Sequence, residues 1–398
     1  MPSPGRVLLA IAALIAAQPA LAGDIVVTGK PLKDTAADLA ECLKRDCPPN
    51  EDMAATIAHA ENQFVSGDYE GARKTLHASL GRNRKHGKDY PVELSNMLRA
   101  NGRVAEHLGE AKDYQLSTLD MRDTLKNGFG EDDFRTLVAQ VEVGDSRAKL
   151  GYPEEAERIY RDVERRALAA RQYRVASFAR LRLALLAQTR FEDEPNGVNA
   201  AQLDSRLAGL IDAPLPDSSD FVLAAKVLRA RKDRRAGSTA STDELVRTFA
   251  SAGGASRPVL LFAEPVAQIN PLEGLPQDME QQRQAWTRWS SNRNGQWVDI
   301  GYWIGQDGHV SDVEVLRSSG AVDWTRPVMK SIAKRVYAPL RQDGDATPGF
   351  FMVERYTLTA RVAEEATGTH LRVREARPRI EVLELTADAA DQQAGKTN

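Results

Sequence analysis

The chain has 398 residues, a length that predicts two domains with linkers rather than one ordinary domain. Its 53 basic residues nearly balance its 56 acidic residues, which leaves a net charge of −3. Because the chain has no excess of positive charge, neither nucleic acid nor an anionic membrane surface is expected as its main partner.

The N-terminus has the parts of an export signal, which we expect to occupy residues 1–22. Arg6 supplies the positive charge, an apolar run follows, and an Ala-Leu-Ala cleavage motif ends at Ala22, before Gly23. The apolar run is shorter than the ~20 residues that span a bilayer. We therefore expect cleavage between Ala22 and Gly23 and an exported mature protein. The alternative is an uncleaved segment that anchors the chain in a membrane.

The segment expected after the signal, residues 23–52, contains both cysteines of the chain. An exported protein with an even number of cysteines usually oxidises them, so Cys42 and Cys47 are predicted to form a structural disulfide. In the chain-entropy model, closing so short a loop contributes roughly 2 kcal/mol. The spacings of redox and haem-binding cysteine motifs are absent, and a zinc site would require further Cys or His ligands nearby.

Residues 53–213 have a helical pattern that repeats. Gly67, Gly109 and Gly151 lie 42 residues apart, and each follows an apolar helical stretch. One helix must turn into the next at these positions, which favours a residue without a Cβ. Helix, short turn and helix at a fixed period predict an α-helical solenoid. The units resemble tetratricopeptide repeats, best in the G-D-Y-x-x-A that begins at Gly67. Such a stack offers a groove to a peptide or a partner helix; the alternative is a helical bundle without repeats.

Residues 214–256 are expected to be a linker, because Pro-, Ser- and Gly-rich stretches surround one short helical segment. That segment, residues 221–235, ends in a cluster of Lys and Arg. Such a cluster could hold an acidic surface, but we prefer to interpret it as a solvated helix end stabilised by the helix dipole.

Residues 257–386 are expected to form a small α+β domain. The alternation of Val298, Ile300, Tyr302 and Ile304 with other residues predicts a strand with one buried face. A Gln-Asp-Gly turn then closes a hairpin onto a returning strand that begins at Val310.

One helix and one strand are expected to complete the domain. Apolar residues at helical spacing from Val328 to Val336 predict a helix that crosses the sheet and that Pro339 ends. Residues 353–361 alternate again and predict a third strand. The segments 369–375 and 379–386 are candidates for extra strands, and the polar tail of residues 387–398 is expected to be disordered.

The order of hairpin, helix and strand in residues 295–361 resembles the C-terminal domain of the TonB energy-transducer family. The matching features are the Asp307-Gly308 turn, the V-x-V-L-x-S-S-G that ends at Gly320, and the Y-A-P that ends at Pro339. That family's domain binds outer-membrane receptors by adding a receptor strand to an exposed sheet edge. The resemblance therefore implies a periplasmic protein of a Gram-negative bacterium with TonB-dependent receptors as partners. The candidate partner-binding edge is the third strand, with Val353, Arg355, Thr357, Thr359 and Arg361 along it.

Three departures from the TonB family favour an adaptor over a working energy transducer. The family keeps an uncleaved N-terminal membrane helix, whereas this N-terminus has a cleavage motif. The family's long Pro-rich spacer is replaced here by helical repeats. Third, residues 369–375 could fold back on the third strand and occupy the edge that a receptor needs. A membrane-anchored transducer is the alternative, and it requires that the first segment stays uncleaved.

The sequence contains no catalytic constellation that we recognise. Its six histidines are scattered, and neither H-E-x-x-H nor G-x-S-x-G occurs. Trp297, Tyr302 and Trp303 could form a recognition face, although the core between sheet and helix is the more common place for such side chains. We expect protein–protein interaction, with no enzyme activity, cofactor, metal or small-molecule substrate. An undetected periplasmic enzyme is the remaining alternative, and it requires a cleft lined by reactive groups of shifted pKa.

Overall fold

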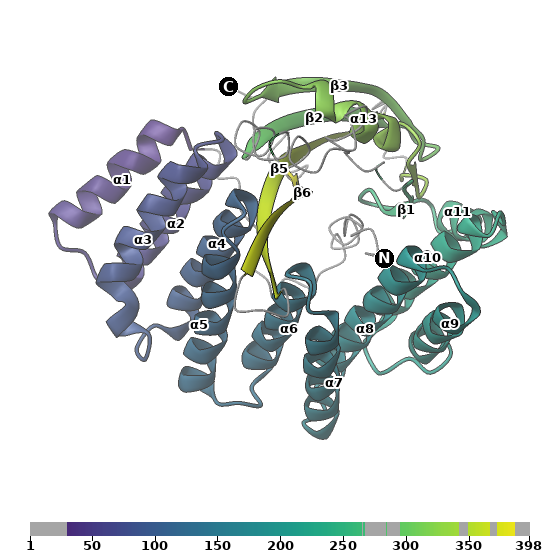
Figure 1. The fold of residues 1–398 in the computed structure, drawn as a ribbon, viewed down its shortest axis with the longest axis horizontal. Helices are drawn as coiled ribbons and strands as arrows, with labels where there is room; N and C mark the ends of the chain where they lie inside the picture. The colour runs from purple at the N-terminus through teal and green to yellow at the C-terminus, as the bar shows by residue number, and fades with distance from the viewer. Residues whose placement is uncertain are drawn as a thin grey trace. The chain divides into compact units, whose positions relative to one another are not determined.

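The computed structural model describes residues 30–264, 266, 284, 295–341, 349–366 and 372–386, without the side chains of residues 360–378. Helices precede an antiparallel sheet along the chain, which confirms the predicted α+β class (Figure 1). The fold divides into two compact units. In the described residues, the first comprises residues 30–170, 361–366 and 372–377, and the second comprises the described residues from 171 to 360 and residues 378–386. The expected signal peptide, its cleavage site at Ala22 and Gly23, and the expected tail at residues 387–398 lie outside the described residues.

The first unit is helical from residue 30 to residue 170. Its helices are α1 (Leu32–Lys44), α2 (Pro49–Val65), α3 (Tyr69–Asn83), α4 (Pro91–Leu108), α5 (Ala111–Phe129), α6 (Phe134–Lys149) and α7 (Pro153–Ala169), with a short 3₁₀ helix at Arg84–His86 after α3. A proline occupies the first turn of α2, α4 and α7, where a missing N–H costs no hydrogen bond.

Helices of the first unit are joined in pairs by turns that contain the three spaced glycines. Gly67, Gly109 and Gly151 lie between α2 and α3, α4 and α5, and α6 and α7, with φ angles of 90°, 76° and 90°. These left-handed angles disfavour any residue with a Cβ. The helix–turn–helix arrangement around the glycines therefore lies where the sequence predicted it.

A buried carboxylate holds α2 and α3 together. Asp52 accepts hydrogen bonds from the Arg82 guanidinium at 2.8 and 2.7 Å and from Asn83 Nδ2 at 2.6 Å, while Thr56 and Ser79 contact it at 3.0 and 3.2 Å. Burial alone would raise the pKa of Asp52, but the hydrogen bonds from Arg82 and Asn83 outweigh it, so the pKa is lowered. The acceptor is charged and well paired, which is the condition for a buried carboxylate to be tolerated.

The second unit begins with four more helices, α8 (Tyr173–Asp193), α9 (Gly197–Ile211), α10 (Ser219–Arg235) and α11 (Ala240–Ser251). Leu203 and Leu207 of α9 pack with Phe221 and Leu228 of α10 and with α8 in one buried cluster. The prediction that residues 214–256 form a linker with one short helix is therefore wrong, because α10 and α11 both lie there and are packed. The Ser- and Thr-rich start of α11 concealed the helix, which is held by burial of Leu245 against Val227 and Ala230.

The sheet of the second unit has four strands in the order β3-β2-β5-β6 (Figure 1). They are β2 (Gln296–Ile304), β3 (Val310–Ser318), β5 (Phe350–Ala366) and β6 (Arg372–Glu384), and β2 is antiparallel to both β3 and β5. Gly308, at φ 84°, lies in the predicted turn between β2 and β3. The predicted face of β2 is confirmed, since Val298, Ile300, Tyr302 and Ile304 are all fully buried in the core.

Helix α13 (Arg326–Ile332) covers that core face, with Val328 and Ile332 fully buried. The crossing helix is present as predicted, but it ends at Ile332 rather than just before Pro339. Val336 and Tyr337 instead form β4, which pairs with β1 (Leu260–Phe262). The backbone of this segment bonds to distant residues, since Tyr337 N donates to Gly308 O and Ala338 N to Val259 O, both at 2.8 Å. A helical pattern read from local spacing does not reveal such partners.

Candidate partner-binding edge of the C-terminal sheet

The strand expected to offer a free edge, β5, lies inside the sheet. On one side β2 pairs with it from Phe350 to Leu358. On the other side β6 pairs with it, and beyond the end of β6 Leu385 N donates to Val353 O at 2.8 Å while Val353 N donates to Thr386 Oγ1 at 3.0 Å. Of the two candidate strands after β5, it is residues 379–386 that lie beside Val353–Thr359, rather than 369–375. The candidate edge is therefore covered, a possibility that the sequence left open.

The side chains of the five candidate residues are mostly enclosed. Arg355, Thr357 and Thr359 are at most 1 % exposed, and Val353 is half-buried. Arg361 lies in β5, but its side chain is outside the described set. These residues therefore serve the packing of the sheet.

Arg355 forms part of a buried ion pair on the face opposite the core. Its guanidinium donates to Asp299 Oδ1 at 2.6 Å and to Oδ2 at 2.9 Å, and Arg317 of β3 donates to Oδ2 at 2.8 Å. The Arg355 guanidinium also stacks on Trp297, 3.9 Å from the ring centroid. Because Asp299 is opposite Arg355 on one side and Arg317 on the other, this cluster fixes the register of β3, β2 and β5.

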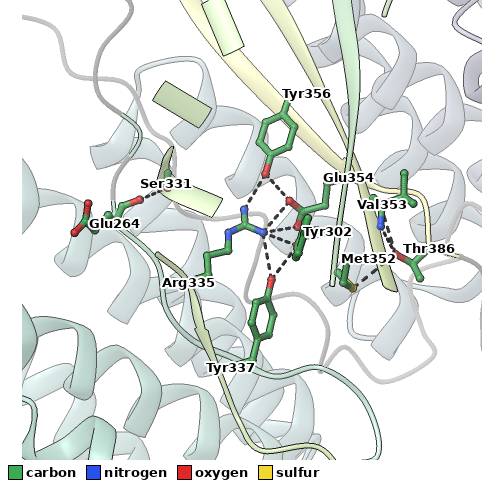
Figure 2. A network of polar contacts seen from close by, with 10 residues as sticks. All are labelled: Glu264, Tyr302, Ser331, Arg335, Tyr337, Met352, Val353, Glu354, Tyr356 and Thr386. Carbon is green, nitrogen blue, oxygen red and sulfur yellow. Dashed lines mark hydrogen bonds and ion pairs between the residues drawn. The ribbon is translucent and has the colours of Figure 1, made fainter. Parts of the chain in front are cut away.

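A second polar network lies within the core face (Figure 2). Arg335 donates to both carboxylate oxygens of Glu354, at 3.0 and 2.8 Å, and to the hydroxyls of Tyr302 and Tyr356 at 2.7 and 2.8 Å. The Tyr337 hydroxyl lies 2.9 Å from that of Tyr302, and Tyr356 donates to Glu354. The network joins β2, β4 and β5 to the segment that follows α13.

Burial decides the protonation of this network. It raises the pKa of Tyr302, Tyr337 and Tyr356, so the three phenols stay protonated at neutral pH. Burial also opposes the charge of Arg335, but Glu354 and the tyrosines outweigh it and hold the pKa of the guanidinium well above its usual value. Each group is engaged with another member of the network, so the arrangement serves to fix the core rather than to present a reactive group.

Neither network was predicted. Asp299, Arg317 and Arg355 alternate with apolar neighbours, a pattern that does not indicate an ion pair between strands, and nothing near Arg335 indicates that it is buried. The only local signal was the opposite charge of Asp299 and the two arginines. It predicts an ion pair only once the register places these residues opposite one another. Of the three aromatic residues considered for recognition, Tyr302 is in the core, Trp297 is covered by Arg355, and Trp303 is half-buried against Phe351.

The outer edge of the sheet on the β2 side is formed by β3. Most of its residues are exposed, including Val315 at 36 % and Leu316 at 41 %. Among the described strands none pairs with its outer side. Strand β3 is therefore one of the two outer strands of the described sheet, the other being β6, and its residues are largely exposed.

The two cysteines lie close enough together for the predicted disulfide. Cys42 and Cys47 lie at disulfide distance, with Cα atoms 5.2 Å apart, at the end of α1. The basic cluster of α10 is partly used within the fold, since Lys232 forms an ion pair with Asp204 and Arg234 lies over the Phe262 ring.

Among the residues that the structure describes, no group of three or more His, Cys, Asp and Glu is arranged to hold a metal ion. No helix in the same residues is long and apolar enough to cross a membrane.

Comparisons of the chain with protein-family models, with curated proteins and with solved structures found no match.

Proposed function

We propose that this protein is a non-catalytic adaptor of the periplasm that binds other proteins through two modules. The C-terminal module is a TonB-like sheet that accepts an extended segment of a partner, and the N-terminal module is a tetratricopeptide-like stack with a groove. The observation that carries the proposal is the exposed outer edge of β3, which presents backbone groups to a partner strand.

The proposal for the helical unit rests on its regular pairs. Three pairs of helices share turns with left-handed glycines at a spacing of 42 residues. Stacked pairs of this kind bind peptides or helices along one face and have no chemistry of their own. The two polar networks of the sheet support a non-catalytic role for the second unit as well, because their charged groups form ion pairs with one another.

Binding to receptor peptides tests this function. Synthetic peptides that span the N-terminal segments of TonB-dependent outer-membrane receptors should bind the full chain saturably, as measured by calorimetry. A variant with the helical unit intact and Leu316→Ser in β3 should bind them more weakly. If no receptor peptide binds either protein, the link to TonB-dependent transport is wrong.

Mass spectrometry of the exported protein tests its location. The proposal expects a mature N-terminus at Gly23. An intact N-terminus in the membrane fraction would instead support the alternative of a membrane-anchored transducer.

A further inference from the structure

We propose that the edge of β3 selects an extended partner segment in which apolar residues alternate with Lys or Arg. This inference rests on the proposed function and names the chemistry of the partner. It is carried by the charge, the apolar surface and the irregular backbone of β3.

The charge of the edge is acidic. Asp312 and Glu314 are exposed, and neither forms an ion pair within the described part of the chain. The nearest base on the strand, Arg317, is engaged by Asp299, with Nη2 2.6 Å from Oδ2. A segment that pairs with β3 therefore meets two carboxylates whose charge is not compensated, and Lys or Arg opposite them is favoured.

The apolar surface lies beside the edge on the face opposite the core. Leu316 is 41 % exposed and packs over Gly301, where a Cβ would come within 2.9 Å of it and within 2.7 Å of Phe351. Phe351 in turn contacts Trp303, with ring centroids 5.1 Å apart, and both rings are half-buried. Leu316, Trp303 and Phe351 therefore form an apolar shelf next to β3, which alternate side chains of an added strand would contact.

The backbone of β3 restricts what can pair. Its register with β2 shifts at two places, between Asp299 and Ile300 and between Gly301 and Trp303, and Asp312 has a φ of 52°. Such bulges and edge charges prevent indiscriminate pairing between sheet edges. A second copy of β3 is disfavoured as the occupant, because it would bring the same carboxylates to this edge.

A peptide selection tests the partner's chemistry. A phage library of random dodecapeptides is selected on the full chain, and the enriched peptide is measured by calorimetry. We expect alternating apolar residues with at least one Lys or Arg. Leu316→Ser and Glu314→Lys should each weaken binding about tenfold. The matched controls Leu116→Ser, on α5 at 46 % exposure, and Glu41→Lys, on α1, should change it less than twofold.

Two results would overturn the assignment. One is a peptide without basic residues, or one whose affinity both β3 variants retain. The other is a dimer in analytical ultracentrifugation that Leu316→Ser dissociates, since the occupant would then be a second copy. Receptor peptides that bind the full chain but tolerate both β3 variants would leave the adaptor role standing and refute only this edge.

Discussion

Asp299 accepts hydrogen bonds from two arginines that differ greatly in exposure. It is fully buried and is shared by Arg355, also fully buried, and by Arg317, whose side chain is 53 % exposed. Removing one partner of a buried pair leaves the other charge without compensation, whereas an exposed partner contributes little.

Substitution of Arg355 is therefore expected to destabilise the fold much more than substitution of Arg317. Arg355→Met should lower the free energy of unfolding by about 3–5 kcal/mol, and Arg317→Met by less than about 1 kcal/mol. Urea denaturation followed by tryptophan fluorescence measures both. The double variant Asp299→Leu with Arg355→Met should recover much of the loss. Equal effects of the two arginines would show that Asp299 does not depend on the buried one.

A second residue, Glu61 of α2, gives the helical unit a dependence on pH. Burial raises the pKa of its carboxyl to about 7, although Arg103 of α4 opposes the shift. Since the folded state holds this proton more tightly than the unfolded state, the contribution of Glu61 to stability is largest below pH 4.5 and falls as the pH rises toward 7.

The expected loss between those pH values is about 1–3 kcal/mol, because the side chain is only half-buried. Glu61→Gln should remove this slope, while Glu41→Gln, at an exposed position on α1, should keep it. Urea denaturation followed by circular dichroism at pH 5 and pH 7.5 compares them. A slope that is unchanged in Glu61→Gln would contradict the raised pKa.

At the scale of the element, the glycine turns of the helical unit make a matched pair of substitutions possible. Gly109 ends α4 at a φ of 76°; its own amide donates to Glu106 O at 3.1 Å, and the next amide, that of Glu110, donates to Ala105 O at 2.8 Å. Gly81, within α3, has an ordinary helical backbone, and a Cβ there would meet nothing within 4 Å.

Gly109→Ala should cost about 1–2 kcal/mol of stability, because alanine strains the left-handed cap. Gly81→Ala should instead gain about 0.5–1 kcal/mol from the lower entropy of the unfolded chain. Thermal unfolding by circular dichroism reports both signs. If the two alanines had effects of the same sign, the turn would not require a glycine.

The elements differ in how far the sequence predicts them. The alternation of Val298 to Ile304 and the spacing of Gly67, Gly109 and Gly151 are local signals, and the structure confirms the buried face of the strand and the helix–turn–helix pairs. The pairing of β6 with β5, the burial of Arg355 and the helix α11 depend on contacts between distant residues. A local pattern cannot supply these contacts, and for that reason the candidate edge was assigned to β5 instead of β3.

On the scale of the whole molecule, we propose that a helical unit and a sheet unit each bind another protein. The sheet encloses β5 between β2 and β6, whereas β3 is an exposed outer strand. Which backbone amides are free in the unbound chain does not depend on the identity of the partner.

Amide hydrogen exchange of the full chain, with and without the selected peptide, tests the proposed β3 edge most directly. We predict slow exchange for residues 353–359 in both states. In β3 we predict fast exchange for those amides of residues 311–318 that do not bond to β2, and slower exchange of the same amides when the peptide binds. Protection of these outward amides in the free chain, or peptide-induced exchange changes in β5 and β6 instead of β3, would contradict the proposed β3 edge.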